Sequence, residues 1–275
     1  MQMEKVTILV AAHKAFPQKS INGYMPVQVG AANSGQDLGF QRDDQGVNIS
    51  EKNPQYCELT AQYWAWKNLQ CDIAGLVHYR RYFTQDMYAE NPEEGIPDAD
   101  KIVQLMKEYK IIIPKAVHKL ACNGTLKKNK PREQQNQPLL LLEDIIKDTA
   151  PEYLGEFEKF AYGRKVSFGN MLIAEKTVFD AYSQWMFHIL SEFEKRGKQY
   201  MDEIPRLCGF LSEYLLCAWV EHNIPADKVL YMDVYNTEEN KKSLAYRVRK
   251  LLVKLGLFDV VGDLGYQFYY WLKRA

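Results

Sequence analysis

The hydrophobic pattern in the first half of the chain alternates between strand-like and helix-like segments. Residues 5–12 are aliphatic and β-branched between polar flanks, which predicts a buried strand. Residues 57–69 repeat apolar positions at helical spacing, and the apolar run at 73–77 predicts a second buried strand. A capped amphipathic helix is expected over 98–109, followed by a strand over 111–113. This alternation is typical of a parallel sheet covered by helices.

The second half begins with a polar stretch that is rich in amides and lysines. Residues 122–138 contain two prolines and predict a loop that is long enough to act as a lid. Regular structure is then expected to return as helices over 139–148, 151–162, 176–195 and 208–222, with a strand over 171–174. The predicted fold class is therefore α/β, a mostly parallel sheet flanked by helices, with one large domain over residues 1–240 and a helical tail over 241–275.

The amino-acid composition limits which binding partners and which cellular compartment are expected. Lysine and arginine together number 35, as do aspartate and glutamate, so no global field favours nucleic acid. The five cysteines are odd in number and show no C-x-x-C spacing, which argues against a disulfide framework or a structural zinc site and fits the cytoplasm. The first apolar run is too short for a signal peptide or a membrane span. We therefore expect a cytoplasmic protein.

Chemistry-bearing residues lie at three strand ends, where α/β sheets bind their ligands. His13 follows the first strand, Asn170 adjoins the strand at 171–174, and the second strand runs into His78, Tyr79, Arg80 and Arg81. Two adjacent guanidinium groups suit a diphosphate, to which the histidine and tyrosine add donors. The alternative is that the arginines are surface charges.

Two further segments offer polar groups. The segment at 46–60 places Asn48 and Asn53 before a helix, where amides can hold a nucleotide or a sugar, although Asn53 can equally serve as a helix cap. Asp98 and Asp100 have the D-x-D form of a metal site, but they follow a proline and open an amphipathic helix. We therefore interpret them as capping residues and predict no metal site.

Glu213 lies within an almost wholly apolar helix at 208–222. A carboxylate in such surroundings is either held by a structural hydrogen bond or has a raised pKa suited to a general base. Glu213 is accordingly the candidate catalytic residue.

The tail at 241–275 carries eight basic residues and two acidic ones among Leu, Val, Phe, Tyr and Trp. This pattern is typical of an element that lies on an anionic membrane surface. A helix docked on the core or a dimer contact is the alternative.

Several blocks of this chain resemble a bacterial glycosyltransferase family found in capsular, exopolysaccharide and O-antigen gene clusters and long catalogued as a domain of unknown function. The blocks are GVNISEKNPQYCELTAQYWAWKN at 46–68, GLVHYRRYF at 75–83, IIIPK at 111–115, GNMLI at 169–173 and GFLSEYLL at 209–216. The resemblance extends over about residues 5–224.

This resemblance implies a GT-A-like fold and transfer of a hexose, galactopyranose or galactofuranose among the candidates, from a UDP-sugar to a lipid-linked oligosaccharide at the inner face of the cytoplasmic membrane. It places His13, Asn48, Asn53 and the 78–81 run on the donor, and Asn170 and Met171 on the acceptor. Because the 78–81 run occupies the position of the usual D-x-D, its arginines are expected to replace a metal. No cofactor is then required, and a divalent cation such as Mn or Mg would at most stimulate the enzyme.

Two departures from the family pattern leave alternatives open. Val47 stands where many relatives have an acidic residue, and the 122–138 stretch lacks the usual Tyr and His residues. A catalytically inactive sugar- or nucleotide-binding scaffold of the polysaccharide machinery is therefore the alternative function. A nucleotidyl- or phosphotransferase is disfavoured because the chain has no Gly-rich phosphate loop.

Overall fold

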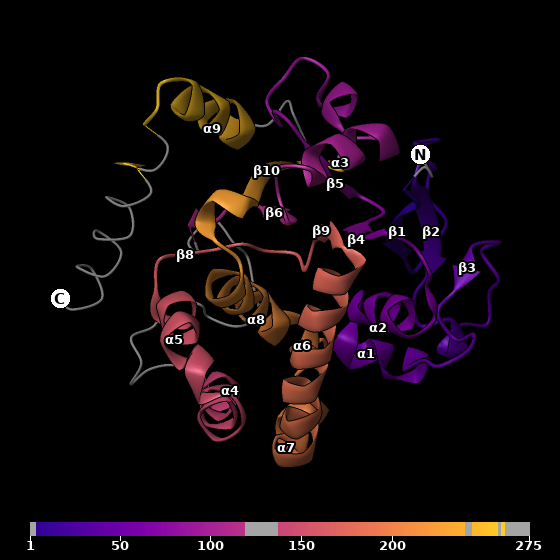
Figure 1. Ribbon diagram of the computed structural model, residues 1–275, viewed down its shortest axis with the longest axis vertical. Coiled ribbons are helices and arrows are strands. Elements are labelled where there is room, and N and C mark those ends of the chain that lie inside the picture. Colours follow the sequence, from indigo (N-terminus) through magenta and orange to yellow (C-terminus); the bar gives the residue numbers. More distant parts are fainter. Residues whose placement is uncertain (1–3, 119–136, 240–243, 258–259, 262–275) are drawn as a thin grey trace.

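The computed structural model describes residues 4–118, 137–239, 244–257 and 260–261, which form an eight-stranded sheet with helices on both sides and a separate two-stranded sheet (Figure 1). The strands are β1 (Val6–Ala12), β2 (Tyr24–Gln28), β3 (Gln41–Arg42), β4 (Ile73–His78), β5 (Arg81–Thr84), β6 (Ile111–Pro114), β7 (Val117–His118), β8 (Lys165–Val166), β9 (Leu172–Glu175) and β10 (Val229–Asn236). The helices are α1 (Asn53–Tyr56), α2 (Leu59–Asn68), α3 (Ala99–Met106), α4 (Gln137–Thr149), α5 (Leu154–Tyr162), α6 (Lys176–Arg196), α7 (Lys198–Glu203), α8 (Leu207–Asn223) and α9 (Leu244–Lys254).

The main sheet has the strand order β3-β2-β1-β4-β5-β10-β6-β9. The first four strands are parallel, and β6 is parallel to β10, whereas β5 and β9 run antiparallel to their neighbours. Strand β9 also pairs with β4, with Ile173 opposite both Gly75 and Ile112. This pairing closes β4, β5, β10, β6 and β9 into a five-stranded barrel.

The expected α/β class is confirmed, but the expected plain, mostly parallel sheet is wrong for this half of the molecule. The closure depends on Gly75, because a Cβ there would lie 2.7 Å from Ile8 Cδ1 and 2.8 Å from Ile173 Cγ1. The absence of a side chain lets β9 approach β4 closely. Sequence patterning predicts β1, β4, β6 and β9 within two residues of their bounds but does not predict β2, β3, β5 or β10.

Side chains alternate between two cores on the faces of the central strands. In β1, Leu9 and Ala11 pack into the larger core while Ile8 and Val10 pack into the smaller one. Figure 1 shows α1, α2 and α4–α8 on the side of the larger core, and α3 with α9 on the opposite side. Burial on both faces explains why β1 and β4 are continuous apolar runs.

Helix α8 forms the centre of the larger core. It packs against α1, α5 and α6, and most of its residues are buried. Its first turn starts beside α1, because the backbone N–H of Arg206 donates to the carbonyl of Pro54 at 3.0 Å. The position of α8 therefore brings Glu213 towards the end of the sheet.

Candidate functional site

The candidate site forms where β4 ends beside the segment that leads into β9. Since β9 is antiparallel to β4, with Leu76 opposite Leu172, the start of β9 lies next to the carboxyl end of β4. His78 Nε2 donates to the carbonyl oxygen of Gly169 at 2.5 Å. The structure thus joins the 78–81 run to the Asn170 segment, as expected, but through the amino end of an antiparallel strand.

Helix α8 supplies the third side of the site. The backbone N–H of Gly169 donates to Glu213 Oε1 at 3.0 Å, so this carboxylate lies against the loop that precedes β9. Glu213 is half-buried. The predicted candidate base therefore lies beside the carboxyl end of β4.

Asn170 connects the loop to two helices. Its side-chain amide donates to Glu58 Oε1 and to the carbonyl of Gly209, both at 2.8 Å, and its Oδ1 accepts from the Ser212 hydroxyl at 2.9 Å. The residue is only 3% exposed, and Met171 is completely buried in the smaller core. The expected contact of these two side chains with an acceptor is therefore not available in this conformation, because both are enclosed by protein.

Backbone strain is concentrated at the same place. Among the described residues, the non-glycine residues with positive φ are Cys57 at 53°, Asn170 at 51° and Arg206 at 64°. Arg206 Nε donates to Cys57 Sγ at 3.2 Å, and Asn170 is bonded to Glu58, the neighbour of Cys57. Each such residue costs roughly 1–3 kcal/mol and persists only where surrounding contacts hold it, a pattern typical of functional sites.

Neither Cys57 nor His78 is charged near neutral pH. Burial, reinforced by the charge of Glu58, raises the pKa of the Cys57 thiol to about 11, so the thiol is not a ready nucleophile. Burial lowers the pKa of His78, and the Glu58 carboxylate, 3.8 Å from Nε2, opposes this shift only in part. His78 is therefore neutral and donates from Nε2.

Arginine side chains give the site its positive charge. Arg81 is half-buried, and burial together with the charge of Arg80 lowers its pKa, against the attraction of Glu58 and Glu213. Arg206 acts on Arg81 in the same direction as Arg80, so three guanidinium groups lie within electrostatic reach of one another. The carboxylates of Glu58 and Glu213 balance part of this charge, and guanidinium groups gathered in this way are suited to binding a phosphate.

The segment that follows β1 adds aromatic rings and the charged side chain of Lys14 to the site. His13 is exposed and meets Tyr79 edge-on at 5.5 Å between ring centres, and Phe16 lies 5.7 Å from the same tyrosine. Partial burial lowers the pKa of His13, as do the charges of Lys14 and Arg80. The residues predicted at the ends of β1 and β4 are therefore neighbours. Arg80 Nη1 is paired with Glu238 at 3.0 Å.

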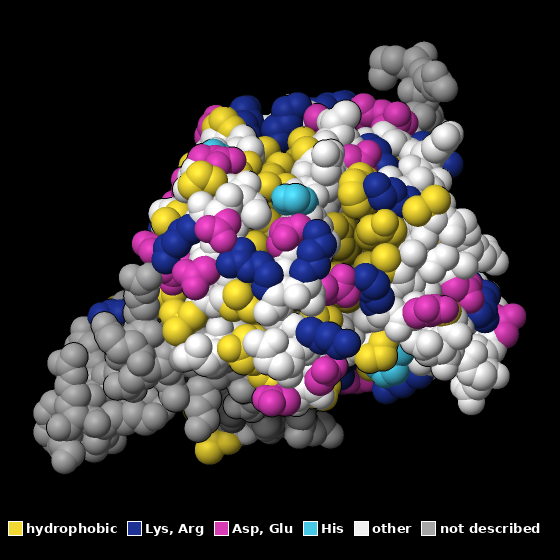
Figure 2. All heavy atoms as spheres, turned by 90° about the horizontal axis from the view of Figure 1, so that it is seen from below, with side chains coloured by type: hydrophobic (Ala, Val, Ile, Leu, Met, Phe, Trp, Pro, Cys, Tyr) yellow, Lys and Arg dark blue, Asp and Glu magenta, His cyan; other side chains and the backbone are white. Residues whose placement is uncertain are grey.

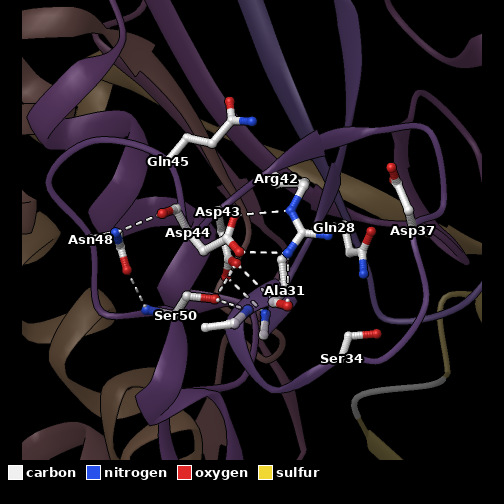
Figure 3. A network of polar contacts seen from close by, with 12 residues as sticks. Gln28, Ala31, Ser34, Asp37, Arg42, Asp43, Asp44, Gln45, Asn48 and Ser50 are labelled. Carbon is white, nitrogen blue, oxygen red and sulfur yellow. Dashed lines mark hydrogen bonds and ion pairs between the residues drawn. The ribbon is translucent and has the colours of Figure 1, made fainter.

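The loops after β2 and β3 are held by Asp43, which sequence patterning did not single out (Figure 3). Its carboxylate accepts from the backbone N–H of Gly30 at 2.8 Å, from that of Ala31 at 3.0 Å, and from the Ser50 hydroxyl at 2.5 Å. Asp43 is completely buried. It fixes the chain that follows β2 against the segment that leads into α1.

The two asparagines expected on the donor belong to this framework. Asn48 donates to the carbonyls of Asp44 and Gly46, at 3.0 and 2.8 Å, and Asn53 donates to the carbonyl of Cys57 at 2.8 Å. Their amides shape the loops beside the site. A direct contact of either residue with a ligand stays a prediction.

The D-x-D sequence lies elsewhere. Asp98 caps α3 by accepting from the backbone N–H of Lys101 at 2.9 Å, which confirms the capping interpretation. The backbone N–H of the next residue, Ala99, donates to the carbonyl of Asn22, just before the amino end of β2. This end of the parallel strands is opposite to the end where His78 lies. Within the described ranges, no group of three or more His, Cys, Asp or Glu residues is arranged to hold a metal ion. The predicted 122–138 loop falls almost wholly outside the described residues.

Glu58, Cys57 and Arg206 are residues of the site that sequence patterning missed. Each owes its place to a turn that joins short elements, and hydrophobic periodicity carries no signal for such turns. The ISEKN-x-x-YCELT block, which includes Cys57 and Glu58, was the one available indication.

Comparisons with known proteins place this arrangement in a family. The chain is similar to the apo structure of WbbM, described as a bifunctional glycosyltransferase, with a TM-score of 0.69 and 26% identity over 86% of this chain and 46% of that one. It thus spans about half the length of that relative. No curated protein matches the chain. A family model described as a domain of unknown function, DUF4422, matches residues 7–224. Because this match extends over most of the chain, from within β1 to the end of α8, the chain belongs to the DUF4422 family.

Proposed function

We propose that this protein is a GT-A-like glycosyltransferase that moves a hexose from a UDP-sugar to a lipid-linked oligosaccharide in surface polysaccharide synthesis. Galactopyranose and galactofuranose are the candidate sugars. The observation that carries the proposal is the similarity of 86% of this chain to part of a bifunctional glycosyltransferase. The strained, charged cluster at the end of β4 supports it independently.

The donor diphosphate would bind at the arginine side of the cluster. Arg80 lies in the turn between β4 and β5, Arg81 is the first residue of β5, and Arg206 approaches from the start of α8. Bidentate guanidinium–phosphate hydrogen bonds would stabilise the negative charge that develops on the leaving diphosphate. Arg80 would exchange its surface partner Glu238 for the ligand, and the rings of His13 and Tyr79 would lie against the nucleoside. Under this proposal no metal is required, and Mn or Mg would at most stimulate the reaction.

Glu213 is the proposed general base. In the transfer step, the bond between sugar C1 and the diphosphate oxygen breaks, and its electron pair leaves with UDP. The acceptor hydroxyl oxygen forms a bond to C1, and the hydroxyl proton passes to the Glu213 carboxylate. The Gly169 N–H that binds Oε1 would keep the carboxylate oriented.

We assign a positioning role to Asn170 in place of the expected acceptor contact. Its three hydrogen bonds hold the loop before β9 against Glu58 and α8, so it sets the distance between the Gly169 backbone and the two carboxylates. Met171 anchors the same loop in the smaller core.

The general-base assignment is tested by Glu213→Gln, with Glu221→Gln as the matched control on the same helix. Glu221 is an exposed residue that pairs with Lys159, so its change should leave turnover unaltered. Loss of a general base is expected to lower kcat by about 10²–10⁴-fold while the protein stays folded. Near-normal turnover in folded Glu213→Gln would assign the carboxylate a structural role. Failure of wild-type protein to turn over any UDP-sugar would favour the inactive scaffold.

A further inference from the structure

Helix α9 contacts the rest of the molecule through one face. Tyr246 is 5% exposed, its ring lies 5.6 Å from that of Tyr88, and its hydroxyl donates to the Met87 carbonyl at 3.5 Å. Arg249 adds an ion pair of 2.6 Å to Glu239. These contacts determine which face of α9 is turned outward, on the side of the molecule away from α4–α8 (Figure 1).

The outward face carries a stripe of exposed aliphatic residues. Leu244, Val248, Leu251 and Leu255 are 75%, 46%, 56% and 59% exposed. Their spacing of four, three and four residues places them on one side of a helix. Eight of the ten large hydrophobic residues that are exposed among those described fall within 244–261. Because soluble monomers rarely leave an aliphatic stripe of this kind open, a partner surface is expected for Leu244, Val248, Leu251 and Leu255.

The charges beside the stripe have one sign. The 244–254 segment contains four basic residues and no acidic one: Arg247, Arg249, Lys250 and Lys254 are basic. At ~100° per residue, Arg247, Lys250 and Lys254 lie along one flank of the stripe. Elsewhere the surface differs, since the face in Figure 2 intermixes acidic and basic side chains.

We propose that α9 docks on an anionic membrane surface, lying in the interface with the Leu244–Leu255 stripe turned towards the acyl chains and the basic flank at the lipid phosphates. None of the described helices has both the length and the apolarity needed to cross a bilayer, so α9 would lie on the surface. A second copy fits the stripe less well, because pairing two stripes would bring two basic flanks together without any acidic partner from α9. This proposal does not depend on the transferase activity.

The test is sedimentation of the full-length protein with vesicles of phosphatidylcholine alone or mixed with phosphatidylglycerol. Wild type is expected to sediment with the anionic vesicles and to remain in solution with the neutral ones. Leu251→Glu should reduce the partition constant by about tenfold or more, since it removes an exposed leucine that membrane binding would bury and adds a charge that the anionic lipids repel. Replacing Arg247, Lys250 and Lys254 by Gln should lower it by roughly fivefold per charge.

Val47→Glu is the matched control. Val47 is exposed to a similar extent, 57%, but lies in the loop before α1, so the same charge there should leave vesicle binding unchanged. Equal binding of wild type and Leu251→Glu would overturn the proposal. The absence of binding to the anionic vesicles would also overturn it. This holds whether the unbound protein is a monomer or a dimer that Leu251→Glu dissociates.

Discussion

Asp43→Asn removes a single negative charge from the centre of the loop framework without changing the size of the side chain. In the native protein, the Asp43 carboxylate accepts from two backbone N–H groups and from the Ser50 hydroxyl, and no part of it reaches solvent. An amide offers one oxygen in place of two. Its nitrogen must then face either Gly30 N–H or Ala31 N–H.

The magnitude follows from these contacts. A hydrogen bond to a charged group contributes about 1.5–3 kcal/mol, and a buried donor left without an acceptor costs about 1–3 kcal/mol. Asn at this position keeps one backbone bond in neutral form, and the Ser50 hydroxyl can rotate to accept from the amide. Together these changes should lower the free energy of unfolding by about 3–5 kcal/mol.

Equilibrium unfolding in urea measures this loss, with Asp44→Asn as the neighbouring control. Asp44 is 21% exposed and forms an ion pair with Arg42 on the surface, which contributes about 0–1 kcal/mol. The two isosteric changes should therefore differ severalfold in their cost. If Asp43→Asn costs less than about 1 kcal/mol, the three hydrogen bonds do not hold the loops after β2 and β3 in place.

Two further changes test the site and the barrel. Because burial lowers the pKa of His78 below its ordinary value of 6.5, the unfolded chain binds more protons than the native protein as pH falls below that value. The contribution of neutral His78 to the free energy of unfolding should therefore be fully present above about pH 6.5 and decline below it. His78→Gln should reduce the dependence of this free energy on pH between about pH 7 and 5. An equal dependence on pH in both proteins, measured by urea titration, would refute a buried neutral histidine. Gly75→Ala should cost about 1–3 kcal/mol of unfolding free energy, because the new Cβ would approach Ile8 and Ile173 within 2.8 Å. Unchanged thermal stability of this variant would show that β4 and β9 can separate without loss.

The hydrophobic pattern predicts the helices and strands whose burial follows a regular period along the chain. β1 and β4 are buried on both faces, and α3 and α6 have clear apolar sides, so hydrophobic period alone indicates them. β10 does not alternate, since its buried residues Val229, Met232 and Tyr235 recur every third position and not every second one. It is a strand because β5 and β6, both distant in sequence, pair with it. No local signal carries that information.

The candidate site was predictable to the same extent. The ends of β1 and β4 meet as their positions along the chain imply, whereas the loop before β9 joins them because β9 is antiparallel to β4, which the expected parallel sheet did not imply. The hydrogen bonds of the Asn170 side chain with Glu58, Gly209 and Ser212 could not be predicted in this way. They depend on where α8 begins, which is set by packing across the larger core. Asp43 was missed because a carboxylate buried among backbone N–H groups looks, in sequence, like any loop aspartate.

The proposed donor site can be tested most directly by thermal-shift titration with UDP, UDP-galactose, UDP-glucose, UDP-N-acetylglucosamine and GDP-mannose, with and without manganese. A ligand that binds only the native protein must raise the unfolding midpoint. A donor site at the guanidinium groups should give a UDP-selective shift that persists without manganese and is lost in Arg81→Gln. A shift that requires manganese, or one that Arg81→Gln leaves intact, would contradict a donor site built on the guanidinium groups beside β4. The absence of a shift with every nucleotide would contradict it as well.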